Sequence, residues 1–209
     1  MDTKTTMRIG ILGGTFNPIH IGHLILAQDA LEQFELNRVL FVPCAKPPHK
    51  KAAGLLSAEH RLRMIEVALE GDLRFEISPV ELQRGGTSYT VDTLRELAPA
   101  WPGARFYLIL GGDSLLELHL WKDVYSLLEL CEVVTLVRPG HDAEPVTAET
   151  LSLRAPWPGR LVKNVWTGHR VEVSSTDIRR RLAEGMSIRY LVHPAVEMYI
   201  AEHGLYMMK

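Results

Sequence analysis

The sequence has few cysteines, and this scarcity already excludes several kinds of protein. Cys44 and Cys131 are the only two among 209 residues. Neither lies in a C-x-x-C pair or beside a histidine cluster, so the sequence gives no support for a disulfide framework, a zinc site or a redox motif. We therefore expect a reduced, cytoplasmic setting.

Long apolar runs and an excess of one charge are also absent. No apolar run reaches the roughly 18 residues that a membrane helix needs, and residues 1–8 are polar rather than typical of a secretion signal. Lys and Arg number 23 and Asp and Glu 25, which leaves a net charge of −2. Since this balance gives no overall attraction to polyanions, we expect neither a nucleic-acid nor a membrane partner. An anionic ligand would have to be held by local groups.

The composition is that of an ordinary globular domain. Hydrophobic residues make up 46% and charged residues 23%, and a chain of this length can bury about 70% of its unfolded surface. We expect a single domain over residues 1–209, with residues 174–209 as a C-terminal helical subdomain.

Short β-branched runs alternate with segments of helical period. This alternation predicts a Rossmann-like α/β fold, an open parallel sheet with helices on both faces. We expect strands at residues 8–12, 38–43, 75–80, 105–110, 133–137, 161–166 and 171–173. We expect helices at residues 22–34, 57–71, from 90 onward, 125–130, 176–184 and 195–203.

Two details of this prediction concern packing and a loop. In the helix over 57–71, the helical period places Leu62, Ile65 and Leu69 on the inward face. Residues 139–158 are rich in proline and weakly periodic, so we expect a long excursion there.

A Gly-Gly turn separates the first predicted strand from the first predicted helix. Backbone N–H groups at such a turn, together with the helix N-terminus, can bind phosphate. The run GGTFNPIHIGH at residues 13–23 contains no Walker GK[ST], and its glycines do not have the G-x-G-x-x-G spacing. It places His20 and His23 at the helix start, with Gly22 allowing close approach. Each imidazole can donate to a phosphate oxygen. The alternatives are surface capping groups, or a zinc site that lacks further ligands.

A second helix start lies near the C-terminus, in the run VSSTDIR at residues 173–179. Ser174, Ser175 and Thr176 form a capped helix start whose first N–H groups can face an anion, and Arg179 lies in the first turn. A triphosphate tail would fit there. The alternative is ordinary capping beside a solvated basic face, and we interpret the next two arginines as surface residues.

Two further segments contain charged groups that could contact a ligand. The run KPPHK at residues 46–50 is a rigid basic loop that could close over phosphates or could simply be solvated. Asp113 follows an apolar predicted strand, at the edge where open α/β sheets bind ligands. A structural cap is the alternative for this carboxylate.

These motifs together resemble a known enzyme family. The run at 13–23 is similar to the GGTFDPxHxGH signature of the HxGH nucleotidyltransferase superfamily, and the run at 173–179 is similar to its ISSTxIR element. The runs SYTVDTL at 88–94 and GGDS at 111–114, with Trp121 eight residues after the aspartate, complete the set. The set resembles the nicotinate-nucleotide adenylyltransferases over nearly the whole chain.

The sequence departs from the family pattern at two positions. Asn17 stands where the family usually has Asp, which is expected to alter the hydrogen bonding of the turn. Val173 stands where Ile is usual, which is a conservative change.

The resemblance implies transfer of AMP from ATP to nicotinic acid mononucleotide, with release of pyrophosphate, in NAD biosynthesis. It implies catalytic roles for His20 and His23 at the α- and β-phosphates and for Arg179 at the β/γ tail. It implies an ATP site at Gly13, Gly14, Thr15, Phe16, His20, His23, Asp113, Ser174, Ser175, Thr176 and Arg179. It implies a mononucleotide site at Thr15, His49, Lys50, Tyr89, Thr90, Trp121 and Lys122.

Within the implied sites, Asp113 would hold ribose hydroxyls and Trp121 would stack on the pyridine ring, unless it is a core residue. The helix start near Thr90 would favour a carboxylate over an amide. Direct in-line attack needs no enzyme nucleophile. Mg²⁺ is expected to be held mainly by ATP phosphates and water, with no protein ligand named.

Four alternatives remain. Phosphopantetheine adenylyltransferase shares the first motif but usually ends it in TxGH and is shorter. A class I aminoacyl-tRNA synthetase fragment would explain HIGH at 20–23, but no KMSKS-like run exists. The others are a catalytically silent nucleotide sensor and a nucleic-acid-binding module, the latter disfavoured by the charge balance. The sequence does not define the oligomeric state.

Overall fold

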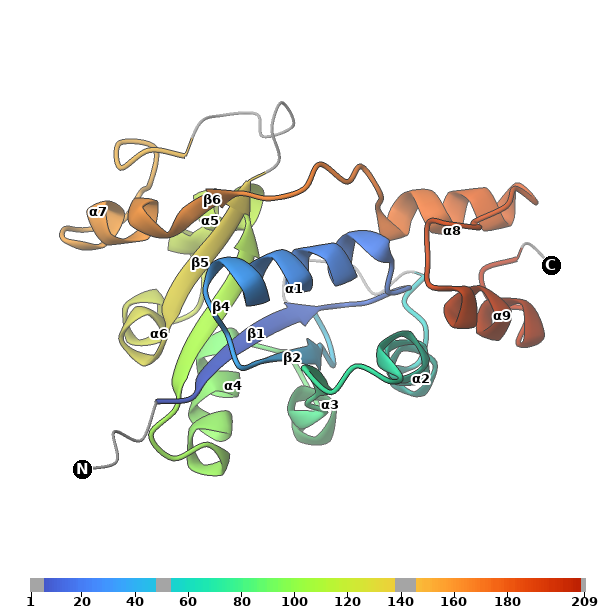
Figure 1. Cartoon of the computed structure of the whole chain (residues 1–209), viewed down its shortest axis with the longest axis horizontal. Coiled ribbons are helices and arrows are strands. Elements are labelled where there is room, and N and C mark those ends of the chain that lie inside the picture. The colour runs from blue at the N-terminus through green and yellow to red at the C-terminus, as the bar shows by residue number, and fades with distance from the viewer. Residues whose placement is uncertain (1–5, 48–53, 138–145, 208–209) are drawn as a thin grey trace.

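The computed structural model describes residues 6–47, 54–137 and 146–207. Its centre is a parallel sheet with the strand order β3-β2-β1-β4-β5-β6 (Figure 1). The strands are β1 (Arg8–Gly14), β2 (Arg38–Pro43), β3 (Phe75–Ile77), β4 (Arg105–Gly111), β5 (Glu132–Val137) and β6 (Val165–Thr167). β1 pairs with both β2 and β4, so the strand order reverses at β1. Open α/β sheets bind ligands at the carboxyl end of such a switch point.

Helices cover both faces of the sheet (Figure 1), which confirms the predicted Rossmann-like α/β class. They are α1 (Ile21–Gln33), α2 (Ala58–Leu69), α3 (Val80–Arg84), α4 (Thr90–Leu97), α5 (Gly112–Leu116), α6 (Val124–Leu130), α7 (Trp157–Leu161), α8 (Ser175–Ala183) and α9 (Pro194–Glu202). Within the described residues, none of the helices combines the length and apolarity needed to cross a membrane.

Alternate residues of β1, β2, β4 and β5 enter two separate cores. On β4, Tyr107 and Ile109 pack into a core that also holds α1, α2, α8 and α9. Phe106, Leu108 and Leu110 face the other way, into a core with α4, α5, α6 and α7. The expected subdomain over residues 174–209 stays a prediction, although α8 and α9 share a core with the first half of the chain.

Most of the predicted elements are present, and the second helix begins as expected after Ser57, whose Oγ accepts the N–H of His60 at 3.4 Å. The strand predicted over 75–80 ends at Ile77, and α3 begins at Val80. Pro79 explains the early end, because proline has no N–H to continue a ladder.

The two strands predicted beyond residue 160 are wrong in whole or in part. Residues 157–161 form α7 and residues 162–164 a 3₁₀ turn, so β6 begins only at Val165. Residues 171–173 form no strand. Asp29 of α1 accepts the N–H of His169 at 2.8 Å and ties this connection to a helix instead of to the sheet. Of the expected excursion over 139–158, residues 139–145 lie outside the described residues.

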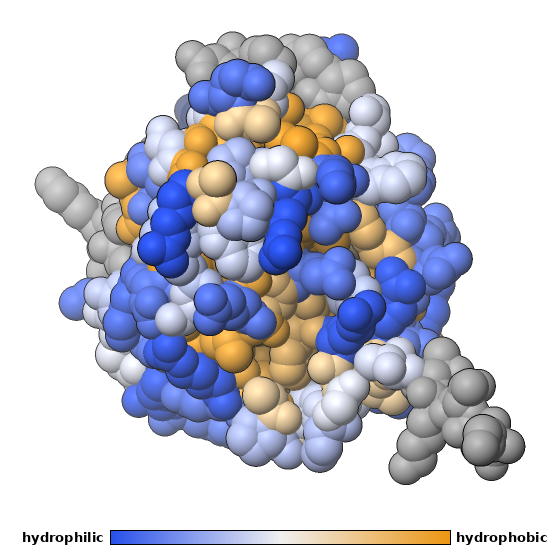
Figure 2. Space-filling view, turned by 90° about the vertical axis from the view of Figure 1, so that its left-hand side faces the viewer, coloured by the Kyte–Doolittle hydropathy of each residue, from blue (hydrophilic) through white to orange (hydrophobic). Residues whose placement is uncertain are grey.

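A hollow on the side of α6 and α7 contains the second cysteine. Figure 2 shows this side of the molecule, with apolar surface near its middle and hydrophilic residues around it. The hollow has a volume of about 320 Å³ and is lined by Leu128, Cys131, Glu132, Val133, Trp157, Arg160, Leu161, Lys163 and Asn164. Burial raises the pKa of the Cys131 thiol to about 12, and neighbouring Glu132 acts in the same direction. This thiol therefore stays protonated at neutral pH.

Candidate active site

The loop between β1 and α1 is the centre of the site, and we call residues 13–20 the phosphate loop. It leaves the sheet at the switch point and ends at His20, the N-cap of α1. Phe16 takes a left-handed backbone conformation, with φ of 47°, and its ring is 1% exposed. A Cβ atom on Gly14 would lie only 3.1 Å from that ring, so a larger residue there would push against the ring of Phe16.

The two signature histidines lie against each other at the start of α1. The ring of His20 is almost buried, and its centroid lies 3.7 Å from that of His23. The backbone N–H of His20 donates to Nδ1 of His23 at 3.2 Å. A neutral imidazole that accepts at Nδ1 carries its proton on Nε2. His23 therefore has an Nε2–H that can donate to an anion.

The glycine between these histidines has a steric function. A Cβ on Gly22 would lie 3.0 Å from Nδ1 and 3.1 Å from Cε1 of His20. Distances this short would displace the ring, so Gly22 makes room for the observed position of His20.

The C-terminal motif docks directly on the phosphate loop. Nη1 of Arg179 donates to the main-chain oxygen of Asn17 at 2.8 Å, across 162 residues of sequence. The hydroxyl of Ser175 donates to the main-chain oxygen of Pro18 at 2.9 Å. Nη2 of Arg179 also contacts Oγ1 of Thr176 at 3.3 Å. The structure thus brings the two predicted motifs together at the end of β1.

The side chain of Asn17 makes three hydrogen bonds to two further segments. It is 5% exposed. Its Oδ1 accepts the hydroxyl of Tyr206 at 2.8 Å and the N–H of Leu56 at 3.3 Å, and its Nδ2 donates to the main-chain oxygen of Gly54 at 2.8 Å. An ionised Asp, the usual residue of the family, could not make the bond to Gly54 because it has no donor.

Arg61 of α2 lies buried behind the phosphate loop, although periodicity predicts that Leu62 faces inward. Arg61 is 1% exposed, whereas Leu62 is only half-buried. The guanidinium donates to the main-chain oxygen of Thr15 at 2.9 Å and to that of Leu56 at 3.2 Å. Burial lowers its pKa, partly offset by Cys44 and other neighbours, but arginine remains protonated in proteins. Hydrophobic periodicity assigns charged residues to the surface, so sequence reasoning missed this buried cation.

A pocket of about 320 Å³ opens between the phosphate loop and α4. Its lining includes seven of the predicted ligand residues: Gly13, Gly14, Thr15, Tyr89, Thr90, Trp121 and Lys122. It also includes polar residues and small side chains that sequence reasoning did not select: Cys44, Pro47, Glu81, Ser88, Thr93, Ser114 and Glu117. Apolar residues of β1, β2, β4 and α6 form the rest of the wall, so the pocket lies at the predicted edge of the sheet.

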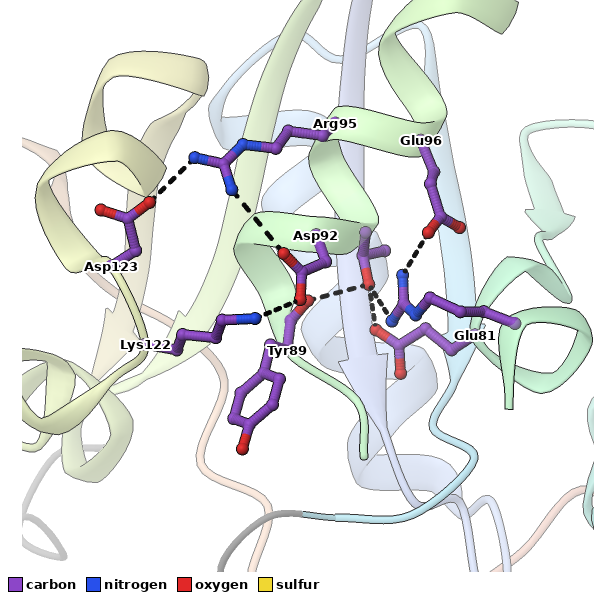
Figure 3. A network of polar contacts seen from close by, with 9 residues as sticks. Glu81, Tyr89, Asp92, Arg95, Glu96, Lys122 and Asp123 are labelled. Carbon is purple, nitrogen blue, oxygen red and sulfur yellow. Dashed lines mark hydrogen bonds and ion pairs between the residues drawn. The ribbon is translucent and has the colours of Figure 1, made fainter. Parts of the chain in front are cut away.

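An ion-pair network ties the Trp121 segment to α4 (Figure 3). Nζ of Lys122 lies 2.8 Å from Oδ2 of Asp92 and 4.5 Å from the centre of the Tyr89 ring. Arg95 bridges Asp92 at 3.7 Å and Asp123 at 2.8 Å, and its hydrogen bond is the main reason why the pKa of Asp123 is lowered. Single exposed ion pairs contribute little, but these pairs share partners, and one of them involves Lys122, which lines the pocket.

A buried polar contact supports α4 from its other side. The hydroxyl of Thr93 lies 2.5 Å from Oε1 of Glu81, and both side chains are buried. Nη2 of Arg84 donates to the same hydroxyl at 3.1 Å, while Nη1 pairs with Glu96 (Figure 3). Fixing Thr93 in this way holds the beginning of α4, and with it Tyr89 and Thr90, against the pocket.

The remaining predicted ligand residues have different positions. Asp113 lies in the first turn of α5, just beyond β4, and is exposed outside the pocket lining. Ser174 caps α8 by accepting the N–H of Asp177 at 3.1 Å. His49 and Lys50 lie outside the described residues. In the described part of the chain, no group of three or more His, Cys, Asp or Glu residues is placed to hold a metal ion.

Comparisons with known proteins agree on one family. Residues 11–181 match the cytidylyltransferase-like family. The chain is 42% identical to a probable nicotinate-nucleotide adenylyltransferase of Geotalea daltonii and 44% identical to one of Opitutus terrae, and each match covers 96% of this chain and 98% of the relative.

Solved structures show the same fold. The nicotinic acid mononucleotide adenylyltransferase of Plasmodium falciparum, solved in complex with APC, is 19% identical with a TM-score of 0.72, over 96% of this chain and 97% of that chain. The same protein in complex with NaAD gives a TM-score of 0.71. With its motifs assembled at the end of β1 and close relatives over nearly its full length, the chain belongs to the nicotinate-nucleotide adenylyltransferases, within the cytidylyltransferase-like family.

Proposed function

We propose that this protein transfers AMP from ATP to nicotinic acid mononucleotide, giving nicotinic acid adenine dinucleotide and pyrophosphate. The observation that carries the proposal is the contact between Arg179 and the phosphate loop. It places a guanidinium, the two stacked histidines and the helix start of α1 at one end of β1. The pocket lined by Tyr89, Thr90 and Trp121 opens beside them.

The chemistry needs positioning and charge stabilisation rather than an enzyme nucleophile. A phosphate oxygen of the mononucleotide attacks the α-phosphorus of ATP in line, one P–O bond forms, and the bond to pyrophosphate breaks. His23 donates from Nε2 and, with His20, stabilises the charge that builds on the transferred phosphate. Arg179 uses two N–H groups within the protein, and the remaining donors of its guanidinium bind the β/γ tail.

Mg²⁺ fits this site as a phosphate-bound ion. The described residues provide no cluster of carboxylates or histidines for it, and Mg²⁺ commonly binds through substrate phosphates while keeping several waters. When bound, it would neutralise the leaving pyrophosphate. We name no protein ligand for it.

Selection of the acceptor follows from the wall of the pocket formed by α4. Tyr89 is the N-cap of α4 and makes no side-chain capping bond, and the N–H of Asp92 already donates to its main-chain oxygen. The N–H groups of Thr90 and Val91 are therefore the ones that we propose bind a carboxylate. Trp121 supplies an aromatic face for the pyridine ring, and Lys122 a cation at the pocket mouth. From the family motifs we also propose that His49 and Lys50 contact the mononucleotide phosphate. On the same basis we propose that Asp113 contacts ribose hydroxyls.

Product analysis tests the proposed reaction. The protein is incubated with ATP and Mg²⁺ and with nicotinic acid mononucleotide, nicotinamide mononucleotide or phosphopantetheine, and the products are identified by mass. We expect a dinucleotide with the acid and a lower kcat/KM with the amide. An equal or higher kcat/KM for the amide would contradict the proposed selection, and transfer only to phosphopantetheine would contradict the proposed reaction.

The location and partners of the protein follow from the same features. Among the described residues neither Cys44 nor Cys131 forms a disulfide, and we propose a cytoplasmic enzyme whose ligands are the two nucleotides. We propose neither a nucleic acid nor a membrane as a partner.

A further inference from the structure

Tyr206 joins the segment after α9 to the middle of the phosphate loop. Its hydroxyl lies 2.8 Å from Oδ1 of Asn17, 189 residues earlier. Its backbone has a φ of 64°, a left-handed conformation that is uncommon for an aromatic residue. Such conformations persist where surrounding contacts enforce them. The position of this hydroxyl is therefore set by the tertiary fold and not by the local preference of the chain.

The Tyr206 hydroxyl acts as a donor and fixes the orientation of the Asn17 amide. Burial raises the pKa of Tyr206 despite two nearby arginines, so the phenol stays protonated at neutral pH. Oδ1 of Asn17 also accepts the N–H of Leu56. With two donors directed at Oδ1, the amide has one favourable orientation, in which Nδ2 faces the main-chain oxygen of Gly54.

Asn17 links the orientation of its own side-chain amide to the position of Arg179. The main-chain oxygen of the same buried Asn17 accepts Nη1 of Arg179 at 2.8 Å. Movement of the amide would move the oxygen that holds the guanidinium. We infer that Tyr206 is a positioning residue: its hydroxyl fixes Asn17, and Asn17 fixes Arg179. This inference rests on the proposed adenylyl transfer, in which Arg179 binds the phosphate tail of ATP.

The alternative is that the hydroxyl contributes only to stability, because the ring of Tyr206 packs against the first core. Tyr199 of α9 provides a matched control. Its hydroxyl lies 2.9 Å from Nδ1 of His60, on α2, and within the part of the chain that the structure describes it makes no hydrogen bond with the phosphate loop. Replacing either tyrosine by phenylalanine removes one hydroxyl bond and keeps the ring.

The experiment compares Tyr206→Phe with Tyr199→Phe by thermal melting and by kinetics with ATP and the mononucleotide varied separately. We expect Tyr206→Phe to lower kcat/KM for ATP about threefold to tenfold, as loss of one hydrogen bond allows. The KM for the mononucleotide should stay unchanged. Tyr199→Phe should leave all kinetic constants unchanged, and both variants should show similar small changes in melting temperature.

A double-mutant cycle with Arg179→Lys tests the route of the effect. If Tyr206 acts through Arg179, Tyr206→Phe should have less than half of its effect in the Arg179→Lys background. Full additivity, or equal kinetic effects of Tyr206→Phe and Tyr199→Phe, would overturn the inference.

Calorimetric binding of α,β-methylene ATP separates this inference from the proposed function. If the wild-type protein binds the analogue but transfers AMP to no acceptor, the proposed function fails, and the affinity of Tyr206→Phe for the analogue still tests the positioning role. If the wild-type protein transfers AMP and Tyr206→Phe matches it in both affinity and kcat/KM, the positioning role alone fails.

Discussion

The imidazole rings of His20 and His23 stack with an angle of 28° between their planes, and the ring of Phe16 meets His23 edge-on with centroids 5.0 Å apart. This packing restricts both histidines before any ligand arrives. Active groups held in place in this way need little rearrangement when charge develops on a substrate. Two substitutions test whether this stacking matters: Gly22→Ala, next to the rings, and His23→Ala, which removes one of the rings.

Gly22→Ala should reduce activity without unfolding the protein. The new Cβ would lie 3.0 Å from Nδ1 of His20 and force its ring to move, whereas alanine in a helix is favoured over glycine by up to about 1 kcal/mol. We expect kcat to fall about tenfold or more with a nearly unchanged melting temperature. Gly159→Ala, where the added Cβ meets no atom within 4 Å, is the control. Equal activity of the two variants would show that the ring position is not critical.

His23→Ala should lower kcat by several orders of magnitude while the protein remains folded. The Nε2–H of His23 is proposed to bind the transferred phosphate most strongly as its charge increases, so the loss appears in kcat more than in binding. Steady-state kinetics and thermal melting on the same sample check this. His20→Ala should act similarly and weaken ATP binding more. Near-normal turnover of His23→Ala with unchanged melting would contradict the mechanism.

Trp121→Ala should weaken binding of the mononucleotide more than it destabilises the fold. The indole is half-buried, lines the pocket and also packs against the second core. A fully buried tryptophan would cost about 3–5 kcal/mol on truncation, and we expect a smaller loss here, with a KM for the mononucleotide at least about tenfold higher. Trp101 packs against the same core outside the pocket lining, so Trp101→Ala should lower stability and leave this KM unchanged. A large loss of stability with an unaltered KM would remove Trp121 from the site.

Cys131 should react slowly with thiol reagents at pH 8. Its pKa is raised from 9.0 to about 12 by burial, so the folded protein contains little thiolate. Because the unfolded chain ionises this thiol near pH 9 and the folded chain only near pH 12, stability should fall between these values, by at most about 1.4 kcal/mol per pH unit. Urea unfolding of the wild type and of Cys131→Ala at pH 7, 9 and 10 measures the difference. A rate of alkylation equal to that of the unfolded protein would contradict the prediction.

The sheet and the position of the site could be predicted because they depend on local patterns. β1, β2 and β4 are continuous apolar runs, and such runs indicate strands buried on both faces. The run at 171–173, Val-Glu-Val, has the apolar–polar alternation of a half-buried strand but forms no strand. A segment forms a strand only where the edge of a sheet lies beside it, and the local sequence does not show whether such an edge is there.

The support of the site could not be predicted for a related reason. Arg61 and Tyr206 reach the phosphate loop from α2 and from the segment after α9, and no motif or period marks either as a partner of residues 15–17. Their positions result from packing between elements distant in sequence. Motifs therefore identified groups proposed to touch the substrates, whereas the residues that hold those groups became visible only in three dimensions.

The separation of Asn17 from Arg179 by 162 residues also sets an order of events during synthesis. Ribosomes make the chain from its N-terminus at about 5–20 residues per second, so the phosphate loop exists for roughly ten to thirty seconds before its arginine is made. Tyr206 is made later still. During that interval the nascent chain can pair β1 with β2 and β4 but cannot complete the phosphate site. The proposed ATP site is therefore complete only in the last stage of translation.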